Sequence, residues 1–238
     1  MKTLVIIPTY NERESIRELI SAIHSHLPAC DILIVDDASP DGTGRLVAEI
    51  GAADPRLNLL ERRGKLGLGT AYIAGFRHAL ESGYECIIGM DADFSHDPAH
   101  LPQLVGALSH CDLAIGSRYV PGGSTPDWKM SRRLVSRFGN WFARTFLELP
   151  VRDCTTGYKC YRREALARLD LDRIHLIGYA FLIETTYQCF QNGARIEELP
   201  ITFIDRRVGK SKMSGAIALE AFRYVVRRRW SRGRTTRS

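Results

Sequence analysis

No part of the sequence is wholly apolar over more than a few residues, whereas a membrane-spanning helix needs about 20. The chain opens with a strand-like segment at residues 3–8, not with the basic segment, long apolar stretch and cleavage site of a signal peptide. Its six cysteines are scattered and form no Cys-x-x-Cys pair, which is typical of reduced thiols in an intracellular protein. We therefore expect neither an integral membrane protein nor a disulfide-stabilised secreted one.

Acidic residues are missing from residues 223–238, a segment that contains seven arginines. These arginines account for the formal net charge of +6, so the remainder of the chain is close to neutral. A basic end is typical of proteins that meet a polyanionic surface, either membrane headgroups or nucleic acid, and a solvated disordered end is the alternative. A nucleic-acid binding module would need basic residues spread over the body as well.

The 238 residues are enough for one large α/β domain. Short apolar runs predict buried strands, and apolar residues at helical spacing predict helices between them. The expected strands are 3–8, 31–36, 57–60, 86–90, 113–116 and 195–203, and the expected helices are 12–27, one opening at 41–43, 71–80, 98–108, 131–147, 178–191 and 215–230. The alternation predicts a mostly parallel central sheet with helices on both faces. We expect one domain over residues 1–213, followed by a basic amphipathic helix and tail over 214–238.

The most informative segment is residues 87–93, where an apolar run stops at two carboxylates, Asp91 and Asp93. As a buried strand, this run brings both side chains to the carboxyl edge of the sheet, where open α/β sheets bind ligands. Carboxylates this close repel each other unless a cation neutralises them, and a hard divalent cation can also hold a diphosphate. The pattern indicates either a metal site or an acidic strand-to-loop turn.

Two further strand ends carry polar residues that suit a nucleoside. After the first strand, Tyr10 offers a flat ring for stacking on a base, and Glu12 could bind a ribose or a base edge. The alternative is that these residues only mark the start of the following helix. The second strand ends in Asp36 and Asp37. Because neighbouring residues on a strand point to opposite sides, only one of these two can easily face a ligand, and a capped turn is the alternative.

Basic residues gather near other predicted element ends. Residues 62–71 are glycine-rich and lead into a helix, whose first N–H groups favour anions, but they lack the Ser or Thr of a phosphate-binding P-loop. A late cluster contains Arg206, Arg207, Lys210 and Lys212, and Arg118 follows an earlier strand. Guanidinium forks suit phosphate oxygens. We expect Arg207 and Lys210 to be surface residues.

The order of these motifs along the chain is more specific than any one of them. In chain order the motifs are Pro8-Thr9-Tyr10-Asn11-Glu12, Val35-Asp36-Asp37-x-Ser39-x-Asp41-Gly42-Thr43, Gly64-Lys65-x-Gly67-Leu68-Gly69-x-Ala71, Asp91-Ala92-Asp93 and Gly116-Ser117-Arg118-Tyr119. This order resembles a family 2 inverting glycosyltransferase of the GT-A fold. Residues 153–159 and 206–212 resemble, more narrowly, the polyprenol (dolichol) phosphate mannose synthase branch.

The resemblance implies a role for each matching residue. The residues implied to contact the nucleotide sugar are Pro8, Tyr10, Glu12, Val35, Asp37, Lys65, Asp91, Ala92, Asp93, Arg118, Arg206 and Lys212. Asp91 and Asp93 are the implied ligands of Mg²⁺ or Mn²⁺, and Ser95 stands where some synthases of this family have a Gln that also binds the metal. The implied catalytic residues are Asp93, Arg118, Arg206 and Lys212.

The implied reaction transfers mannose from GDP-mannose to a polyprenyl phosphate, with inversion. Because a phosphate monoester is mostly ionised at neutral pH, the acceptor needs cationic capture, for which Arg132 and Arg133 are further candidates. A lipid acceptor also gives a role to the apolar residues 134–146, for which core packing is the alternative, and to the basic end. We expect a peripheral enzyme on the cytoplasmic face of an anionic membrane, with a membrane-anchored partner subunit where one is needed, and no nucleic acid.

Two other enzyme functions fit parts of the sequence. The segment Asp91-Ala92-Asp93-Phe94-Ser95 also resembles the first motif of haloacid-dehalogenase-type phosphatases, in which Asp91 would be a nucleophile. That interpretation leaves Tyr10 and Asp37 without a task. Within the glycosyltransferase fold, transfer of glucose from UDP-glucose to a polyprenyl phosphate is the closer alternative.

Overall fold

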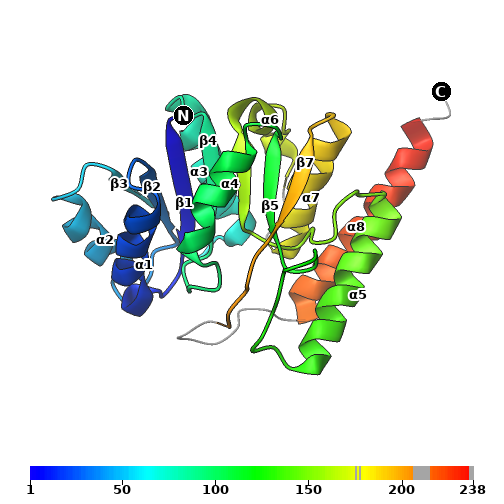
Figure 1. Cartoon of the computed structure of the whole chain (residues 1–238), viewed down its shortest axis with the longest axis horizontal. Helices are drawn as coiled ribbons and strands as arrows, with labels where there is room; N and C mark the ends of the chain where they lie inside the picture. The colour runs from blue at the N-terminus through cyan, green and yellow to red at the C-terminus, as the bar shows by residue number, and fades with distance from the viewer. Residues whose placement is uncertain (175, 177, 206–214, 236–238) are drawn as a thin grey trace.

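The computed structural model describes residues 1–174, 176, 178–205 and 215–235. The strands among these residues are β1 (Thr3–Thr9), β2 (Asp31–Asp36), β3 (Leu57–Glu61), β4 (Cys86–Gly89), β5 (Leu113–Ser117), β6 (Lys159–Arg162) and β7 (Ile196–Pro200). They form one sheet in the order β3-β2-β1-β4-β6-β5-β7 (Figure 1). Neighbouring strands pair in parallel except at β6, which runs antiparallel to both β4 and β5. The predicted mostly parallel sheet is confirmed.

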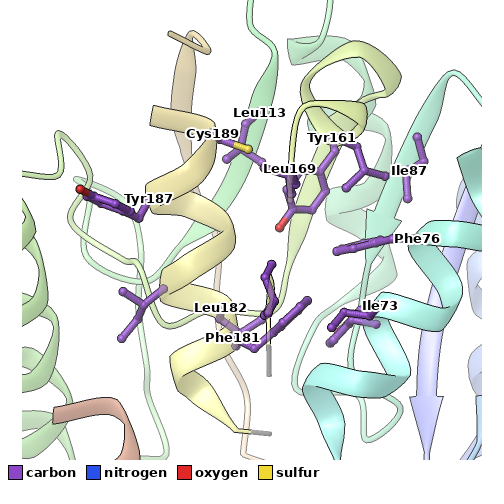
Figure 2. Packing of buried hydrophobic residues seen from close by; sticks show 14 of the residues in the cluster. Ile73, Phe76, Ile87, Leu113, Tyr161, Leu169, Phe181, Leu182, Tyr187 and Cys189 are labelled. Carbon is purple, nitrogen blue, oxygen red and sulfur yellow. The ribbon is translucent and has the colours of Figure 1, made fainter. Parts of the chain in front are cut away.

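Helices cover both faces of this sheet, also as predicted. They are α1 (Arg13–His26), α2 (Thr43–Gly51), α3 (Leu68–Glu81), α4 (Leu101–Ala107), α5 (Met130–Leu147), α6 (Arg163–Ala167), α7 (Tyr179–Gln191) and α8 (Gly215–Thr235), with short 3-10 turns at Pro98–His100 and Leu171–Arg173. Alternate residues of a strand face opposite sides. On β1, Val5 packs with α1 and α4, whereas Leu4 packs with α3 and α7. Figure 2 shows part of the apolar cluster on the α3 and α7 side of the sheet, where the ring of Phe76 packs against that of Phe181.

The sequence analysis missed β6 and the adjoining α6. The four residues of β6 include two basic ones, so they show no apolar run, yet the strand is central in the sheet. The side chain of Lys159 is completely buried, and its Nζ donates a hydrogen bond of 2.5 Å to the carbonyl oxygen of Leu182. Burial lowers the pKa of Lys159 to about 8.

The two long helices α5 and α8 lie side by side at one end of the molecule, beyond β7 (Figure 1). Phe222 of α8 stacks on Phe142 of α5 with ring centroids 4.8 Å apart. Helix α8 also contacts α7, because the Tyr224 hydroxyl donates a hydrogen bond to the Glu184 carboxylate. The neighbouring Val225 is buried in the core. None of the helices described is both long and apolar enough to cross a membrane.

Candidate active site at the carboxyl edge of the sheet

Three neighbouring strands bring the N-terminal motifs to one edge of the sheet. In the parallel pairing of β1 with β2, Pro8 lies opposite Val35. On the other side of β1, Ile6 lies opposite Gly89 of β4, and the N–H of Met90 continues the pairing. Asp91 therefore follows directly at the carboxyl edge, where ligands bind in open α/β sheets.

The two aspartates at the end of β2 have different tasks. Asp36 fixes the turn that follows, because its carboxylate accepts hydrogen bonds from Thr9 Oγ1 (2.7 Å) and from the backbone N–H of Ser39 (2.8 Å). The carboxylate of Asp37 points the other way, and it accepts from the N–H groups of Leu66 (3.0 Å) and Gly67 (3.1 Å) and pairs with Arg62. Asp37 thus ties the glycine-rich loop to the edge of the sheet.

Tyr10 and Lys65 are brought together by this loop. The Nζ of Lys65 lies 4.2 Å from the centroid of the Tyr10 ring, although 55 positions separate the two residues in the chain. Glu12 precedes α1; its N–H donates to Thr43 Oγ1 (3.0 Å) and its carbonyl receives the first N–H groups of the helix. Tyr10, Glu12 and Lys65, three of the residues predicted to contact the nucleotide sugar, thus lie around the ends of β1 and β2.

The carboxylates of Asp91 and Asp93 differ in exposure. The Asp91 side chain is 35% exposed, whereas Asp93 is buried and its Oδ1 accepts a hydrogen bond of 3.1 Å from the N–H of Ser95. Between them, the carbonyl of Ala92 accepts from Ser15 Oγ, which fixes the loop on α1. Ser95 itself is buried.

This donor set suits a magnesium-type ion that binds with its substrate. The described residues contain no group of three or more His, Cys, Asp or Glu side chains able to hold a metal alone. Mg²⁺, however, usually takes only one or two carboxylates and completes its shell with waters and substrate phosphates. The partly exposed Asp91 and the adjacent Asp93 fit that pattern, and they do not fit a preformed metal cage.

His96 belongs to the same loop and was missed by the sequence analysis. Its ring is buried, stacks on Tyr158 with centroids 4.7 Å apart, and accepts a hydrogen bond at Nδ1 from the N–H of Asp91 (3.0 Å). Burial lowers the pKa of His96 against the attraction of the nearby aspartates, so the neutral ring carries its proton on Nε2. The only available sequence signal is its position three residues after Asp93.

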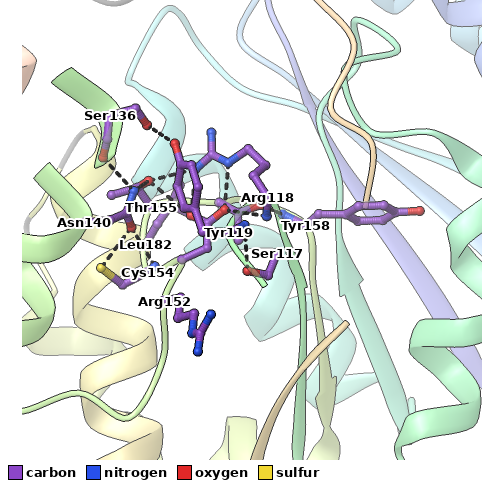
Figure 3. A network of polar contacts seen from close by, with 12 residues as sticks. Ser117, Arg118, Tyr119, Ser136, Asn140, Arg152, Cys154, Thr155, Tyr158 and Leu182 are labelled. Carbon is purple, nitrogen blue, oxygen red and sulfur yellow. Dashed lines mark hydrogen bonds and ion pairs between the residues drawn. The ribbon is translucent and has the colours of Figure 1, made fainter. Parts of the chain in front are cut away.

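Arg118, at the end of β5, is buried in an ion pair (Figure 3). Its Nε and Nη2 each donate to the Asp153 carboxylate at 2.7 Å, and Nη2 also donates to Thr155 Oγ1. Burial opposes both charges, but their mutual attraction outweighs it, so the pKa of Arg118 is raised and that of Asp153 is lowered. Asn140 of α5 joins this network through Thr155.

Arg118 also lines a cleft of about 220 Å³ with two other arginines. The residues around it are Arg118, Tyr119, Gly123, Ser124, Thr125, Pro126, Arg133 and Arg137. Arg133 is held in the lining of this cleft because its Nη2 donates a hydrogen bond of 2.7 Å to the carbonyl of Thr125. Arg137, which the sequence analysis did not single out, completes the basic lining.

The side chains of the neighbouring residues Arg132 and Arg133 have different surroundings in the structure. The Arg132 guanidinium pairs with Asp205 at 2.8 Å and lies 4.1 Å above the Trp128 ring, and Arg132 is not among the residues that line the cleft. The predicted phosphate-binding residues Arg206 and Lys212, and the predicted surface residues Arg207 and Lys210, lie outside the described residues.

The model of the family "Glycosyl transferase family 2" matches residues 4–170. The chain therefore belongs to glycosyl transferase family 2, as its motifs predicted, and the phosphatase alternative is wrong. Among curated proteins, it is 48% identical over 227 residues to an undecaprenyl-phosphate mannosyltransferase of Micrococcus luteus, covering 95% of this chain and 93% of the relative. It is 46% identical over 240 residues to the polyprenol monophosphomannose synthase of Mycolicibacterium smegmatis, covering 100% and 90%.

Solved structures of lower identity show the same fold. Glucosyl-3-phosphoglycerate synthase from Mycobacterium tuberculosis, in complex with UDP, has a TM-score of 0.68 at 20% identity and covers 96% of this chain and 80% of its own. A mannosyltransferase from Pyrobaculum calidifontis, in complex with GDP-mannose and Mn²⁺, has a TM-score of 0.64 at 21% identity and covers 95% and 64%. The predicted GT-A fold is confirmed.

Proposed function

We propose that this protein transfers mannose from GDP-mannose to a polyprenyl phosphate with inversion, giving polyprenyl β-D-mannosyl phosphate and GDP. The observation that carries the proposal is the identity of 46–48% to two polyprenyl-phosphate mannosyltransferases over nearly the full length of each. The arrangement of the sheet edge supports it, because separate groups are available for a nucleoside, a diphosphate and a second phosphate.

The donor would bind across the ends of β1, β2 and β4. Tyr10 and Lys65 offer a ring and a cation for the nucleoside, beside the loop that Asp37 fixes. Asp91 and Asp93 would hold a divalent cation, either Mg²⁺ or Mn²⁺, and structures of the same fold contain Mn²⁺ with a nucleotide sugar. When bound, such an ion neutralises charge on the leaving diphosphate.

The acceptor phosphate would enter the cleft beside α5. Because it is already ionised, the protein has only to capture it opposite the leaving group. The charge of Arg118 is largely balanced by Asp153, so Arg118 shapes the cleft, and the net positive charge comes from Arg133 and Arg137. Arg206 and Lys212 stay predictions for the phosphates of donor or acceptor.

The lipid chain would leave this cleft along an exposed apolar surface. Residues of α5 that are more than half exposed include Leu134, Val135, Phe138 and Trp141. On α8, the adjoining Phe222 and Trp230 are exposed beside basic side chains. Such a surface suits peripheral docking on the cytoplasmic face of an anionic membrane, with which a membrane-anchored partner subunit would be compatible.

A labelling experiment tests the proposal directly. The purified protein is incubated with a polyprenyl phosphate, Mg²⁺ or Mn²⁺, and either labelled GDP-mannose or labelled UDP-glucose, and the label in the organic phase is measured. We expect the mannose label to enter the lipid. Transfer from UDP-glucose alone would replace the proposal with the glucosyltransferase alternative, and transfer from neither donor would refute both.

A further inference from the structure

Tyr72 of α3 has a buried hydroxyl group with no hydrogen-bond partner among the described residues. The residue is 1% exposed and its ring stacks on Phe181, with the ring planes 5° apart. A buried hydroxyl without a partner destabilises the folded state. Uncompensated polar groups of this kind gather at functional sites, so the position of this oxygen is informative.

The Tyr72 hydroxyl and the carboxylate of Asp91 both border the space beside Gly157. A Cβ atom added to Gly157 would lie 3.3 Å from Asp91 Oδ1 and 3.3 Å from Tyr72 Oη, so both oxygens face the same small space. The Tyr72 ring is held there because it packs over Gly89, where an added Cβ would be 3.0 Å from its Cε1. Gly89 thus leaves room for the Tyr72 ring, and Gly157 leaves the space that the tyrosine hydroxyl and the aspartate share.

His96 approaches Asp91 from another side. Its Nδ1 accepts from the N–H of Asp91, and its Nε2 lies 3.7 Å from Asp91 Oδ2. The ring cannot turn freely, because it is stacked on Tyr158 and meets the edge of Phe203. One oxygen of the carboxylate therefore faces an N–H group, and the other faces the tyrosine.

We propose that Tyr72 and His96 are positioning residues that orient the Asp91 carboxylate for a divalent cation, with Gly157 leaving the space they need. When the cation is bound, Tyr72 donates its proton toward Oδ1 through one water, and His96 holds the backbone and Oδ2. The inference rests on the proposed function, in which Asp91 binds the metal. It assigns a task to Gly157, within the 153–159 motif, and to Tyr72, whose hydroxyl has no hydrogen-bond partner in the part of the chain that the structure describes.

The test measures Mn²⁺ binding without turnover, by electron paramagnetic resonance of free Mn²⁺ in the presence of saturating GDP. Hydrogen-bond partners of metal ligands typically contribute about 10- to 100-fold to metal affinity. We expect Tyr72→Phe and Gly157→Ala to weaken Mn²⁺ binding by at least about 10-fold. His96→Leu should do the same, and His96→Asn, which keeps an acceptor near Nδ1, should recover part of the loss.

Matched controls separate this role from a structural one. Tyr161→Phe removes another buried hydroxyl, which bonds Thr185, and Gly139→Ala adds a Cβ where there is open space; neither should change Mn²⁺ affinity. Tyr72→Phe should raise the thermal midpoint, because it removes an unsatisfied buried group. Unchanged Mn²⁺ affinity in folded Tyr72→Phe and Gly157→Ala would overturn the inference. A wild-type protein that binds no Mn²⁺ with GDP would instead refute the metal-dependent function itself.

Discussion

Helices α1 and α5 have similar amphipathic sequences and opposite surroundings. The apolar residues of α1, such as Leu19 and Ile23, are completely buried against the sheet. Those of α5, such as Phe138 and Trp141, are more than half exposed, and its buried residues are Asn140, Ala143 and Leu147. An apolar stripe at helical spacing therefore predicts that a surface will be covered, but it does not tell whether sheet, lipid or another chain covers it.

Paired substitutions on these two helices sharpen the contrast most. Leu19→Ala creates a cavity in the core and should lower the free energy of unfolding by about 2–5 kcal/mol. Phe138→Ala on the exposed stripe should change it by less than about 0.5 kcal/mol, while weakening binding to phospholipid vesicles. Urea denaturation and vesicle sedimentation measure the two effects. A large loss of stability in Phe138→Ala would mean that α5 is an ordinary core helix.

A second comparison is between the two proposed phosphate-binding regions. In the proposed function, strand ends within residues 1–117 bind the donor, and the cleft near α5 binds the acceptor. Asp93→Asn removes one charge on the donor side with little change in size. We expect turnover to fall by at least about 100-fold, the scale of a lost electrostatic contact in the transition state, whatever the length of the lipid. Near-normal turnover of this variant in excess chelator would contradict the metal site.

The positions of the proposed donor-side residues at the sheet edge could be predicted from the sequence because their signals are local. An apolar run that ends at Asp91 places the carboxylate at the sheet edge once the strands are known to be parallel. The proposed acceptor side depends on contacts between residues that are farther apart in the chain. Arg118 pairs with Asp153, 35 positions later, and Asn140 of α5 donates to Thr155, 15 positions later. Neither contact leaves a periodic pattern, and β6 was missed because two of its four residues are basic, so it shows no apolar run.

Single arginine variants test the acceptor side itself. Arg133 lines the cleft, whereas its neighbour Arg132 pairs with Asp205. Charge-assisted hydrogen bonds are worth roughly 1.5–3 kcal/mol, so Arg133→Ala should raise the KM for polyprenyl phosphate by about 10-fold or more, with little change in the KM for GDP-mannose. Arg132→Ala is the matched control and should have the smaller effect. The reverse order would move the acceptor phosphate out of the cleft.

The smallest expected effect concerns α8. Truncation after Leu219 would remove the basic end, but it would also take Val225 out of the core and break the contact of Tyr224 with Glu184, so it would confound membrane binding with stability. Arg223→Ala is cleaner, because this residue is exposed. One basic residue near an anionic surface contributes about 1 kcal/mol, so binding to anionic vesicles should weaken by about fivefold.

The salt dependence and a matched substitution of another exposed arginine show what causes this loss of vesicle binding. Electrostatic attraction is screened at high ionic strength, so the gap between Arg223→Ala and the wild type should shrink in high salt. The matched control is Arg45→Ala, which removes the same charge from an exposed position on α2. Helix α2 packs on the sheet and is distant from α8 in the sequence. If both variants lose the same small amount of vesicle binding, net charge attracts the membrane and α8 is not its docking surface. A loss confined to Arg223→Ala would place the membrane beside α5 and α8, where the exposed apolar residues already gather.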